Sequence, residues 1–252
     1  MFDKTILYLT DNSLEPWLEK KCQELLINAA NGVPIVSVSQ KPINFGENYC
    51  VGEIGRCGLS IDLQLSEGLK HINTKWVAMA EHDVIYSQEH FAWTPPDDTH
   101  FWYNDNNWLC QLHNPRYPEW DGMYSRKRMR RVQSQLICAT ELLREATVKK
   151  IEILSDPAWL ARHARGRLGE PGSADYRRAM KMSNYRDVRH LQAKLKDYTT
   201  GYAARDWKTK VPNIDIRHGD NFTGPRRGNY RRFELEPWGK LENVLNGELV
   251  CQ

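Results

Sequence analysis

The most constraining feature of the sequence is its opening, where two short apolar runs flank an amphipathic stretch. The runs at 6–9 and 33–38 are typical of buried strands. Residues 13–30 between them predict a helix that Asn12 or Ser13 would cap. Its apolar face would comprise Leu14, Trp17, Leu18, Cys22, Leu25, Leu26 and Ala29. A strand, a helix and a strand with short connections predict the α/β class, with a mostly parallel sheet flanked by helices.

Further elements follow with clear periodicity in most places. Residues 57–70 alternate like a strand at Leu59, Ile61, Leu63 and Leu65, yet they run on to Gly68 like a helix, so both interpretations stay open. We expect a long helix over 127–147, which would place Met129, Val132, Leu136, Ala139 and Leu143 on one stripe. The other expected strands are 76–80, two within 100–112, and 213–217.

Charge divides the chain into two unlike parts. Residues 1–125 hold 8 Lys and Arg against 17 Asp and Glu, for a net charge of −9, whereas residues 126–252 hold 27 against 15, for +12. This asymmetry is compatible with a metal site combined with phosphate binding or with a polyanionic partner, but on charge alone two solvated faces that neutralise each other are favoured. We predict a core over 1–150 and a basic, largely helical extension over 151–252 that completes the site without being an independent domain.

The third apolar strand runs directly into Glu81-His82-Asp83. Open α/β sheets bind their ligands at the carboxyl ends of strands. If the backbone stays extended, Glu81 and Asp83 point to one side and His82 points away. Two carboxylates this close repel each other unless a divalent cation lies between them, so we predict a divalent metal here. A solvated acidic loop after a strand is the alternative.

Two distant segments add to this prediction. Residues 214–221 place His218 after a short strand, where it would be a third metal ligand, with Arg217 beside it for phosphate. The loop 52–58 combines three glycines with Arg56, so its backbone can approach a phosphate closely. The chain has no GxxxxGK[ST] motif, which argues against a Walker-type NTPase.

In this order of elements the chain resembles the GT-A family of nucleotide-sugar-dependent glycosyltransferases. Residues 55–59 stand where many members have an Arg-bearing stretch, and Glu81-His82-Asp83 stands where they have the Asp-x-Asp metal motif. His218 matches the family's C-terminal histidine, and 216–223 looks like the tail of bacterial and phage proteins of this type. The resemblance implies a GT-A-like, Rossmann-like fold, with a nucleotide-sugar-binding core at 1–150.

The resemblance also implies roles for individual residues. Glu81, Asp83 and His218 would hold Mn²⁺ or Mg²⁺ across the diphosphate of a nucleotide-sugar donor, with a UDP-sugar preferred. The donor-binding residues would be Thr10, Asp11, Asn12, Ser37, Ser39, Gln40 and Arg56. The metal and Arg56 would stabilise the departing nucleoside diphosphate, and the enzyme would transfer a hexosyl or pentosyl group.

An inverting reaction needs a carboxylate to deprotonate the acceptor hydroxyl. Asp121 is the first candidate and Glu119 the second, because they precede the expected helix at the position where this family places its base. A carboxylate that favours the helix N-terminus through the macrodipole is the alternative. A retaining enzyme would not need this base.

Basic and aromatic side chains in the second half bear on the acceptor. Residues expected to bind the acceptor or its phosphates are Arg126, Arg128, Arg217, Arg226 and Arg227. Arginines interspersed with Tyr and Trp fit a nucleic acid, such as a hydroxymethylated base in DNA, and basic helix faces or docking to anionic lipid are the alternatives. We expect a glycan or other small acceptor first and DNA second. The alternative functions are a metal-dependent nucleic-acid-binding protein or nuclease, and an interaction module without catalysis.

No apolar run approaches the ~18 residues of a membrane helix, so we expect no integral membrane segment. The first residues lack a basic stretch followed by an apolar one, and the six cysteines are scattered without a CxxC motif. We therefore expect free thiols and a cytoplasmic protein, in the host cytoplasm if a phage encodes it.

Overall fold

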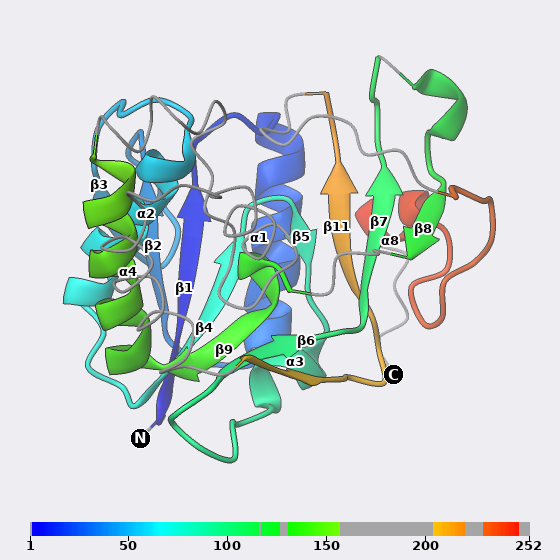
Figure 1. Ribbon diagram of the computed structural model, residues 1–252. Helices are drawn as coiled ribbons and strands as arrows, with labels where there is room; N and C mark the ends of the chain where they lie inside the picture. The colour runs from blue at the N-terminus through cyan, green and yellow to red at the C-terminus, as the bar shows by residue number, and fades with distance from the viewer. Residues whose placement is uncertain (1, 116, 127–130, 157–203, 220–228, 247–252) are drawn as a thin grey trace, which may run out of the picture.

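A computed structural model of the chain describes residues 2–115, 117–126, 131–156, 204–219 and 229–246 (Figure 1). Within these ranges the fold is mixed α/β, as the sequence predicts. The helices are α1 (Pro16–Ala30), α2 (Gly58–Lys70), α3 (Gln88–Ala92), α4 (Thr140–Leu154) and α8 (Leu241–Asn246). Short 3-10 turns lie at η1 (Pro118–Trp120) and η2 (Gln133–Gln135).

The larger sheet has seven strands in the order β10-β6-β9-β4-β1-β2-β3. They are β1 (Lys4–Thr10), β2 (Ile35–Ser39), β3 (Glu47–Cys50), β4 (Trp76–Glu81), β6 (Phe101–Asn104), β9 (Leu136–Ala139) and β10 (Ala204–Trp207). β1 pairs in parallel with both β2 and β4, and β9 pairs antiparallel with β4 and β6. The sheet is therefore parallel where the sequence opening predicts it.

The second sheet has four strands in the order β5-β11-β7-β8. They are β5 (Val84–Ile85), β7 (Asn107–Gln111), β8 (Tyr124–Arg126) and β11 (Asn213–Arg217). β11 pairs antiparallel with β5 and parallel with β7. A strand from the last fifth of the chain thus joins strands that directly follow β4 and β6.

The larger sheet is covered by helices on both faces because the side chains of β1 alternate between two apolar clusters. Leu7 and Leu9 pack with residues of α2 and α4, while Ile6 and Tyr8 pack with residues of α1 and α3. Figure 1 shows the same layers, with α2 and α4 together on one side of β1 and α1 on the other.

α1 also contacts the second sheet. Leu18 and Cys22 lie in a third apolar cluster with Ile214 and Ile216 of β11 and with residues of α8. The first turns of α1 therefore pack against the second sheet, and its last turn packs against the first. This helix fixes the two sheets relative to each other.

Two details of the α1 prediction are wrong. Glu15 occupies the N-cap position, and Pro16 begins the helix, where its missing N–H costs no hydrogen bond. Asn12 instead adopts the left-handed conformation and Asp11 accepts the backbone N–H of Ser13. Trp17 is 45% exposed and lies outside the buried face.

The expected helix over 127–147 is wrong in its first part. Leu136 and Ala139 belong to strand β9, which lies between β4 and β6, and the helix begins only at Thr140. The two residues are buried because β9 is an interior strand of the sheet, a burial that a helical stripe would also produce. Residues 127–130, which include Met129, lie outside the described ranges.

The ambiguous segment 57–70 is the helix α2. Cys57 is its N-cap, and its thiol accepts the backbone N–H of Ser60. Gly68 lies inside the helix, where an added Cβ would collide with side-chain atoms of Leu7 and Val38. Glycine is therefore required for close packing of α2 on the sheet and does not end the helix.

Most of the predicted basic extension lies outside the described ranges, including residues 157–203. The parts that the structure describes beyond residue 150 contain the end of α4, β10, β11 and α8. Among the helices in the described ranges, none is both long and apolar enough to cross a bilayer.

Candidate functional site

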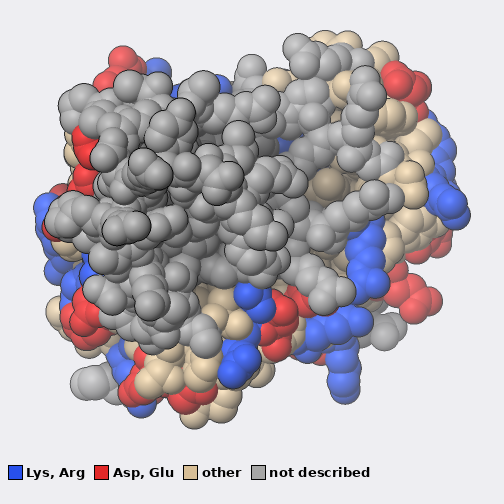
Figure 2. Space-filling view, in the orientation of Figure 1, with Lys and Arg blue, Asp and Glu red and all other residues tan. Residues whose placement is uncertain are grey.

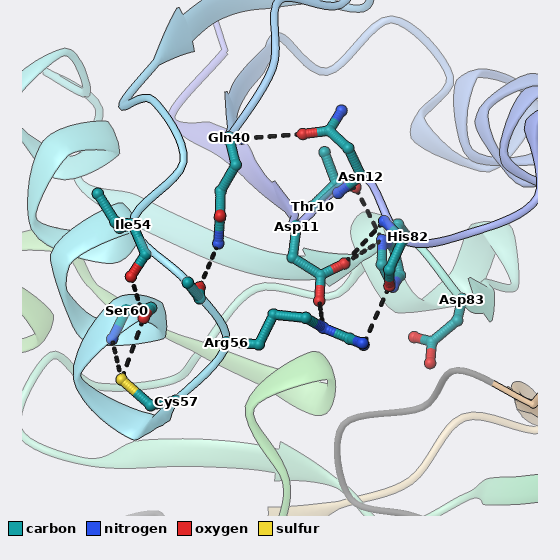
Figure 3. A network of polar contacts seen from close by, with 12 residues as sticks. Thr10, Asp11, Asn12, Gln40, Ile54, Arg56, Cys57, Ser60, His82 and Asp83 are labelled. Atoms are coloured by element: carbon teal, nitrogen blue, oxygen red, sulfur yellow. Dashed lines mark hydrogen bonds and ion pairs between the residues drawn. The ribbon is translucent and has the colours of Figure 1, made fainter.

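The carboxyl ends of β1, β2 and β4 meet at one edge of the larger sheet. The chain leaves β1 through α1 to form β2 on one side, whereas β4 lies on the other side of β1. Such a reversal of strand order opens a crevice at the carboxyl edge, where α/β proteins bind ligands. Figure 3 shows the polar side chains that gather at this place.

Asp11 and Arg56 form the centre of this polar network. Arg56 Nε donates to Asp11 Oδ2 at 2.5 Å, and Arg56 Nη2 donates to Ser13 Oγ at 3.1 Å. Burial raises the pKa of Asp11, but the hydrogen bonds from Ser13 and the charges of His82 and Arg56 outweigh it and hold the pKa below its usual value. Asp11 is thus an anion, paired with the partly exposed Arg56 at the carboxyl edge of the sheet.

The ends of β1 and β2 are tied together by side chains. Asn12 Oδ1 accepts the backbone N–H groups of Gln40 at 2.9 Å and Lys41 at 2.7 Å. Gln40 Nε2 donates to the carbonyl of Gly55 at 2.6 Å, and Gln64 Nε2 donates to the carbonyl of Thr10 at 2.7 Å. These bonds hold the Arg56 loop against the carboxyl edge of the sheet.

Ser37 and Ser39 are fully buried. Ser37 Oγ donates to the carbonyl of Phe45 at 2.6 Å, and Asn48 Nδ2 donates to Ser37 Oγ at 2.9 Å and to Ser39 Oγ at 3.0 Å. Both hydroxyls are therefore inside the fold, bonded to β3 and to the loop that precedes it.

Three side chains form a group that could hold a metal ion: His82, Asp83 and His218. One ligand atom from each lies within 4.8 Å of the others, and His218 Nε2 is 3.8 Å from Asp83 Oδ2. Imidazole nitrogens and carboxylate oxygens are both ligands of divalent metal ions. The three residues therefore fit a divalent metal ion.

In this group His82 takes the place that the sequence analysis gives to Glu81. β4 ends at Glu81, and His82 and Asp83 form a turn before β5. The alternation of an extended strand stops at that turn, so His82 does not point away from Asp83 as expected. In Figure 3, His82 lies between Asp11 and Asp83.

Arg217 and Asp215 extend the charged site along β11. Arg217 Nη1 donates to Asp215 Oδ1 at 3.2 Å, and both side chains are almost fully buried. Burial lowers the pKa of Arg217, but the nearby carboxylates of Asp215 and Asp83 raise it above the usual value. Arg217 is therefore a buried cation that is paired with Asp215 and lies close to Asp83 of the candidate metal group.

The two predicted base candidates lie on the connection between β7 and β8. Asp121 Oδ1 accepts the backbone N–H of His113 at 2.7 Å, which holds the ends of this connection together. Glu119 is exposed in the 3-10 turn η1. After Asp121 the chain enters the strand β8, and the part of the predicted helix that the structure describes begins only at Thr140, so Asp121 does not lie at the N-terminus of that helix and the macrodipole alternative is wrong.

Three aromatic rings stack beside the site. The ring centroids of Tyr117 and Trp120 are 4.3 Å apart, and those of Trp120 and Tyr230 are 5.0 Å apart, with nearly parallel planes. Burial raises the pKa of Tyr230, whose neighbours include Gln111 and Arg217. The stack thus connects the β7–β8 connection with the charged residues of β11.

Basic side chains occur on the side of the molecule that carries β7 and β8 (Figure 2). The exposed arginines there include Arg126 of β8 and Arg231, whose backbone pairs with Tyr124. The predicted acceptor-binding residues Arg128, Arg226 and Arg227 lie outside the described ranges.

Several residues of the site do not appear in the sequence prediction. Glu19 of α1 accepts a hydrogen bond from the Thr10 hydroxyl at 3.3 Å, and Asp215 pairs with Arg217. Asp215 could have been found, because a carboxylate two residues before Arg217 on a strand lies on the same face. Glu19 reads as an ordinary exposed position of a helix, and only the packing of α1 brings it to β1.

Neither a protein-family model nor a curated protein matches this chain. Among solved structures, the chain is similar to the bifunctional IspDF from Campylobacter jejuni, with 12% identity, a TM-score of 0.41, and 82% of this chain and 50% of that chain covered. It thus spans half the length of that protein.

Two further similar structures are glycosyltransferases or carry a nucleotide sugar. A glycosyltransferase involved in the glycosylation of the major capsid of PBCV-1 is 9% identical, with a TM-score of 0.45 and coverage of 87% of this chain and 95% of that one. S. aureus TarS 1-349 in complex with UDP-GlcNAc is 12% identical, with a TM-score of 0.41 and coverage of 90% and 62%. Likenesses as loose as these assign neither a fold family nor a function to this chain.

Proposed function

We propose that this chain is a metal-dependent glycosyltransferase of GT-A type that moves a sugar from a nucleotide-sugar donor, a UDP-sugar, to an acceptor hydroxyl. The observation that carries the proposal is the meeting of two groups at the switch point of the larger sheet. One is the Asp11–Arg56 pair, and the other is the group His82, Asp83 and His218. A nucleoside diphosphate would use both of these groups. It presents hydroxyls and a base at one end and a strongly anionic diphosphate at the other.

The donor would lie along the carboxyl ends of β1 and β2. Thr10, Asp11 and Asn12 would contact its nucleoside, with Gln40 shaping the pocket and Ser37 and Ser39 supporting the wall from behind. Arg56 would leave Asp11 in part to bind the diphosphate, because a phosphate offers more acceptor oxygens to the guanidinium.

His82, Asp83 and His218 would hold Mn²⁺ or Mg²⁺, with Glu81 directly before them in β4. A bound divalent ion supplies Lewis-acid stabilisation of the diphosphate as it leaves. Arg56 and Arg217 add positive charge to the same oxygens, and such preorganised charge is worth most where the leaving group becomes more anionic.

Asp121 is the proposed general base and Glu119 the second candidate, both on the connection between β7 and β8. The acceptor would approach from this side, where Arg126 and the stack of Tyr117, Trp120 and Tyr230 lie. A glycan and a hydroxymethylated DNA base both present a hydroxyl that Asp121 could deprotonate.

Thermal unfolding of the full chain with UDP, GDP or CMP, each with and without Mn²⁺, tests the proposal. A nucleotide at 100 times its Kd should add about 2.7 kcal/mol to the free energy of unfolding. We expect UDP to raise the Tm only with Mn²⁺, and Asp83→Ala to abolish the shift. Stabilisation by DNA in the absence of any nucleotide effect would contradict sugar transfer and favour the nuclease alternative.

A further inference from the structure

The hydroxyl of Thr10 at the end of β1 has three polar neighbours. Its Oγ1 donates to Glu19 Oε1 at 3.3 Å and accepts the backbone N–H of Asn12 at 3.0 Å. It also lies 2.8 Å from Nδ1 of His82, which is the shortest of the three distances. Thr10 is only 2% exposed, so these contacts are not exchanged freely for water.

The number of hydrogen atoms on the Thr10 hydroxyl decides which atom donates in each of its hydrogen bonds. A hydroxyl carries one hydrogen, and an ionised carboxylate can only accept. Once the Thr10 hydrogen points to Glu19, the bond between Thr10 and His82 requires a hydrogen on His82 Nδ1. In a neutral imidazole the lone pair is then on Nε2.

A second acceptor favours the same tautomer of His82. Asp11 Oδ1 lies 3.8 Å from His82 Nδ1, and the other oxygen of this carboxylate accepts a hydrogen bond from Arg56 Nε. Two carboxylates, one directly and one through Thr10, thus attract a proton at Nδ1.

We propose that Glu19 and Thr10 form a positioning relay that fixes His82 with its hydrogen on Nδ1 and its Nε2 lone pair available to the cation. This inference rests on the metal site of the proposed function, and it adds two residues that do not touch the metal. His82 lies in a turn, where the strand no longer sets its direction, so the ring needs such an anchor. Outer hydrogen bonds of this kind typically change metal affinity by 10- to 100-fold.

The first test measures Mn²⁺ affinity of the full chain by electron paramagnetic resonance of the free ion, without donor or acceptor. Thr10→Val keeps the shape and removes the hydroxyl, so we expect the Kd for Mn²⁺ to rise roughly 10- to 100-fold. Thr10→Ser keeps the hydroxyl and should restore near-normal affinity. Thr147→Val is the matched control, because Thr147 is equally buried and its hydroxyl donates within α4 to Leu143.

Glu19→Ala tests the far end of the relay. We expect it to weaken Mn²⁺ binding in the same direction as Thr10→Val, and the double variant to be no weaker than Thr10→Val alone. Glu24→Ala serves as its control, because Glu24 lies on the same helix, half-exposed, beside Lys21. Additive losses in the double variant would overturn the relay.

The second readout needs no metal. Long-range ¹H–¹⁵N spectra of the metal-free protein show which ring nitrogen of His82 carries the hydrogen, and we expect Nδ1 in the wild type and a changed ratio in Thr10→Val. A hydrogen on Nε2 in the wild type, or unchanged Mn²⁺ affinity in Thr10→Val, would overturn the relay alone. Failure of the wild type to bind Mn²⁺ would instead contradict the proposed metal site, which separates the two failures.

Discussion

At the scale of single residues, Arg56 is the side chain whose structural and functional roles can be separated most cleanly. Its side chain is 37% exposed, and exposed ion pairs contribute about 0–1 kcal/mol to folding. A guanidinium bound to a diphosphate makes stronger, charge-assisted hydrogen bonds. We expect Arg56→Gln to leave the Tm nearly unchanged and to raise the Kd for the UDP–Mn²⁺ pair roughly 10- to 100-fold, measured by calorimetry.

Lys41→Gln is a suitable control for Arg56→Gln. Lys41 is also a cation near the pocket edge, but it is 64% exposed and pairs with Glu53. Its substitution should change neither the Tm nor nucleotide affinity. An equal loss of affinity in both variants would show a general effect of charge and contradict a specific role for Arg56.

His90 predicts how stability depends on pH. Burial, with a smaller contribution from Lys4, lowers the pKa of His90 to about 3. Between pH 6.5 and 3 the unfolded chain therefore binds a proton at this residue that the folded chain does not. Above pH 6.5 the titration of His90 does not reduce the free energy of unfolding of the protein. As the pH drops below 6.5, this free energy falls by up to about 1.4 kcal/mol per pH unit.

Urea unfolding between pH 7 and 4 measures this effect. His90→Phe keeps a ring among Tyr86, Phe91 and Trp207 and removes the titration, so we expect a flatter pH dependence than in the wild type. His113→Asn, at an exposed histidine whose positive φ asparagine tolerates, controls for the loss of an imidazole. An unchanged slope in His90→Phe would contradict the assignment.

At the scale of elements, the packing of α2 on the larger sheet depends on Gly68. A Cβ at this position would lie 2.8 Å from Val38 Cγ2 and closer still to Leu7, both in the interior of the sheet. Overpacking of this kind typically costs about 1–3 kcal/mol. We expect Gly68→Ala to lower the free energy of urea unfolding by this amount despite the better helix propensity of alanine.

Ser66→Ala is the matched substitution for Gly68→Ala. Ser66 is on the same helix at a half-buried position, so alanine should stabilise it slightly or leave it unchanged. If Gly68→Ala were as stable as Ser66→Ala, the close approach of α2 to β1 and β2 would be wrong.

The elements that periodicity predicts are those whose environment is simple. The strands β1, β2 and β4 are apolar runs between two helical layers, and their type follows from the sequence alone. β9 could not be predicted, because an interior antiparallel strand that leads straight into α4 has the same apolar spacing as one longer helix. Long-range pairing decides between them.

The candidate site also has a part that the sequence predicts and a part that depends on tertiary structure. Asp11, Arg56, Asp83 and His218 follow from strand ends and a glycine loop, and they meet at the predicted edge. The choice between Glu81 and His82 depends on where β4 ends, and strand ends are set by tertiary contacts such as the bond from the backbone N–H of Glu81 to Tyr86.

At the scale of the whole molecule, both sheets depend on strands that come late in the chain. β10 pairs with β6 at the edge of the first sheet, and β11 joins β5 to β7 in the second. Ile214 and Ile216 of β11 are fully buried, and they pack with residues of α1 and α8. A chain that ends at Asp156 would lack these strands and expose the apolar face that they cover.

We expect this shortened chain to unfold without a single cooperative transition in circular dichroism melts, whereas the full chain unfolds cooperatively. Ile214→Ala in the full chain is a milder version and should lower stability by about 2–5 kcal/mol. A sharp transition for residues 1–156 would show that they form an independent unit and contradict the predicted dependence on the remainder.

Because His82 and His218 are far apart along the chain, the ribosome synthesises them at well-separated times. Ribosomes add roughly 5–20 residues per second, so on the order of ten seconds pass between synthesis of the first and the last member of the proposed metal group. A nascent chain that already displays Asp11 and Arg56 has no complete centre. Under the proposed function, interrupted translation products would therefore be unable to consume donor by reaction with water.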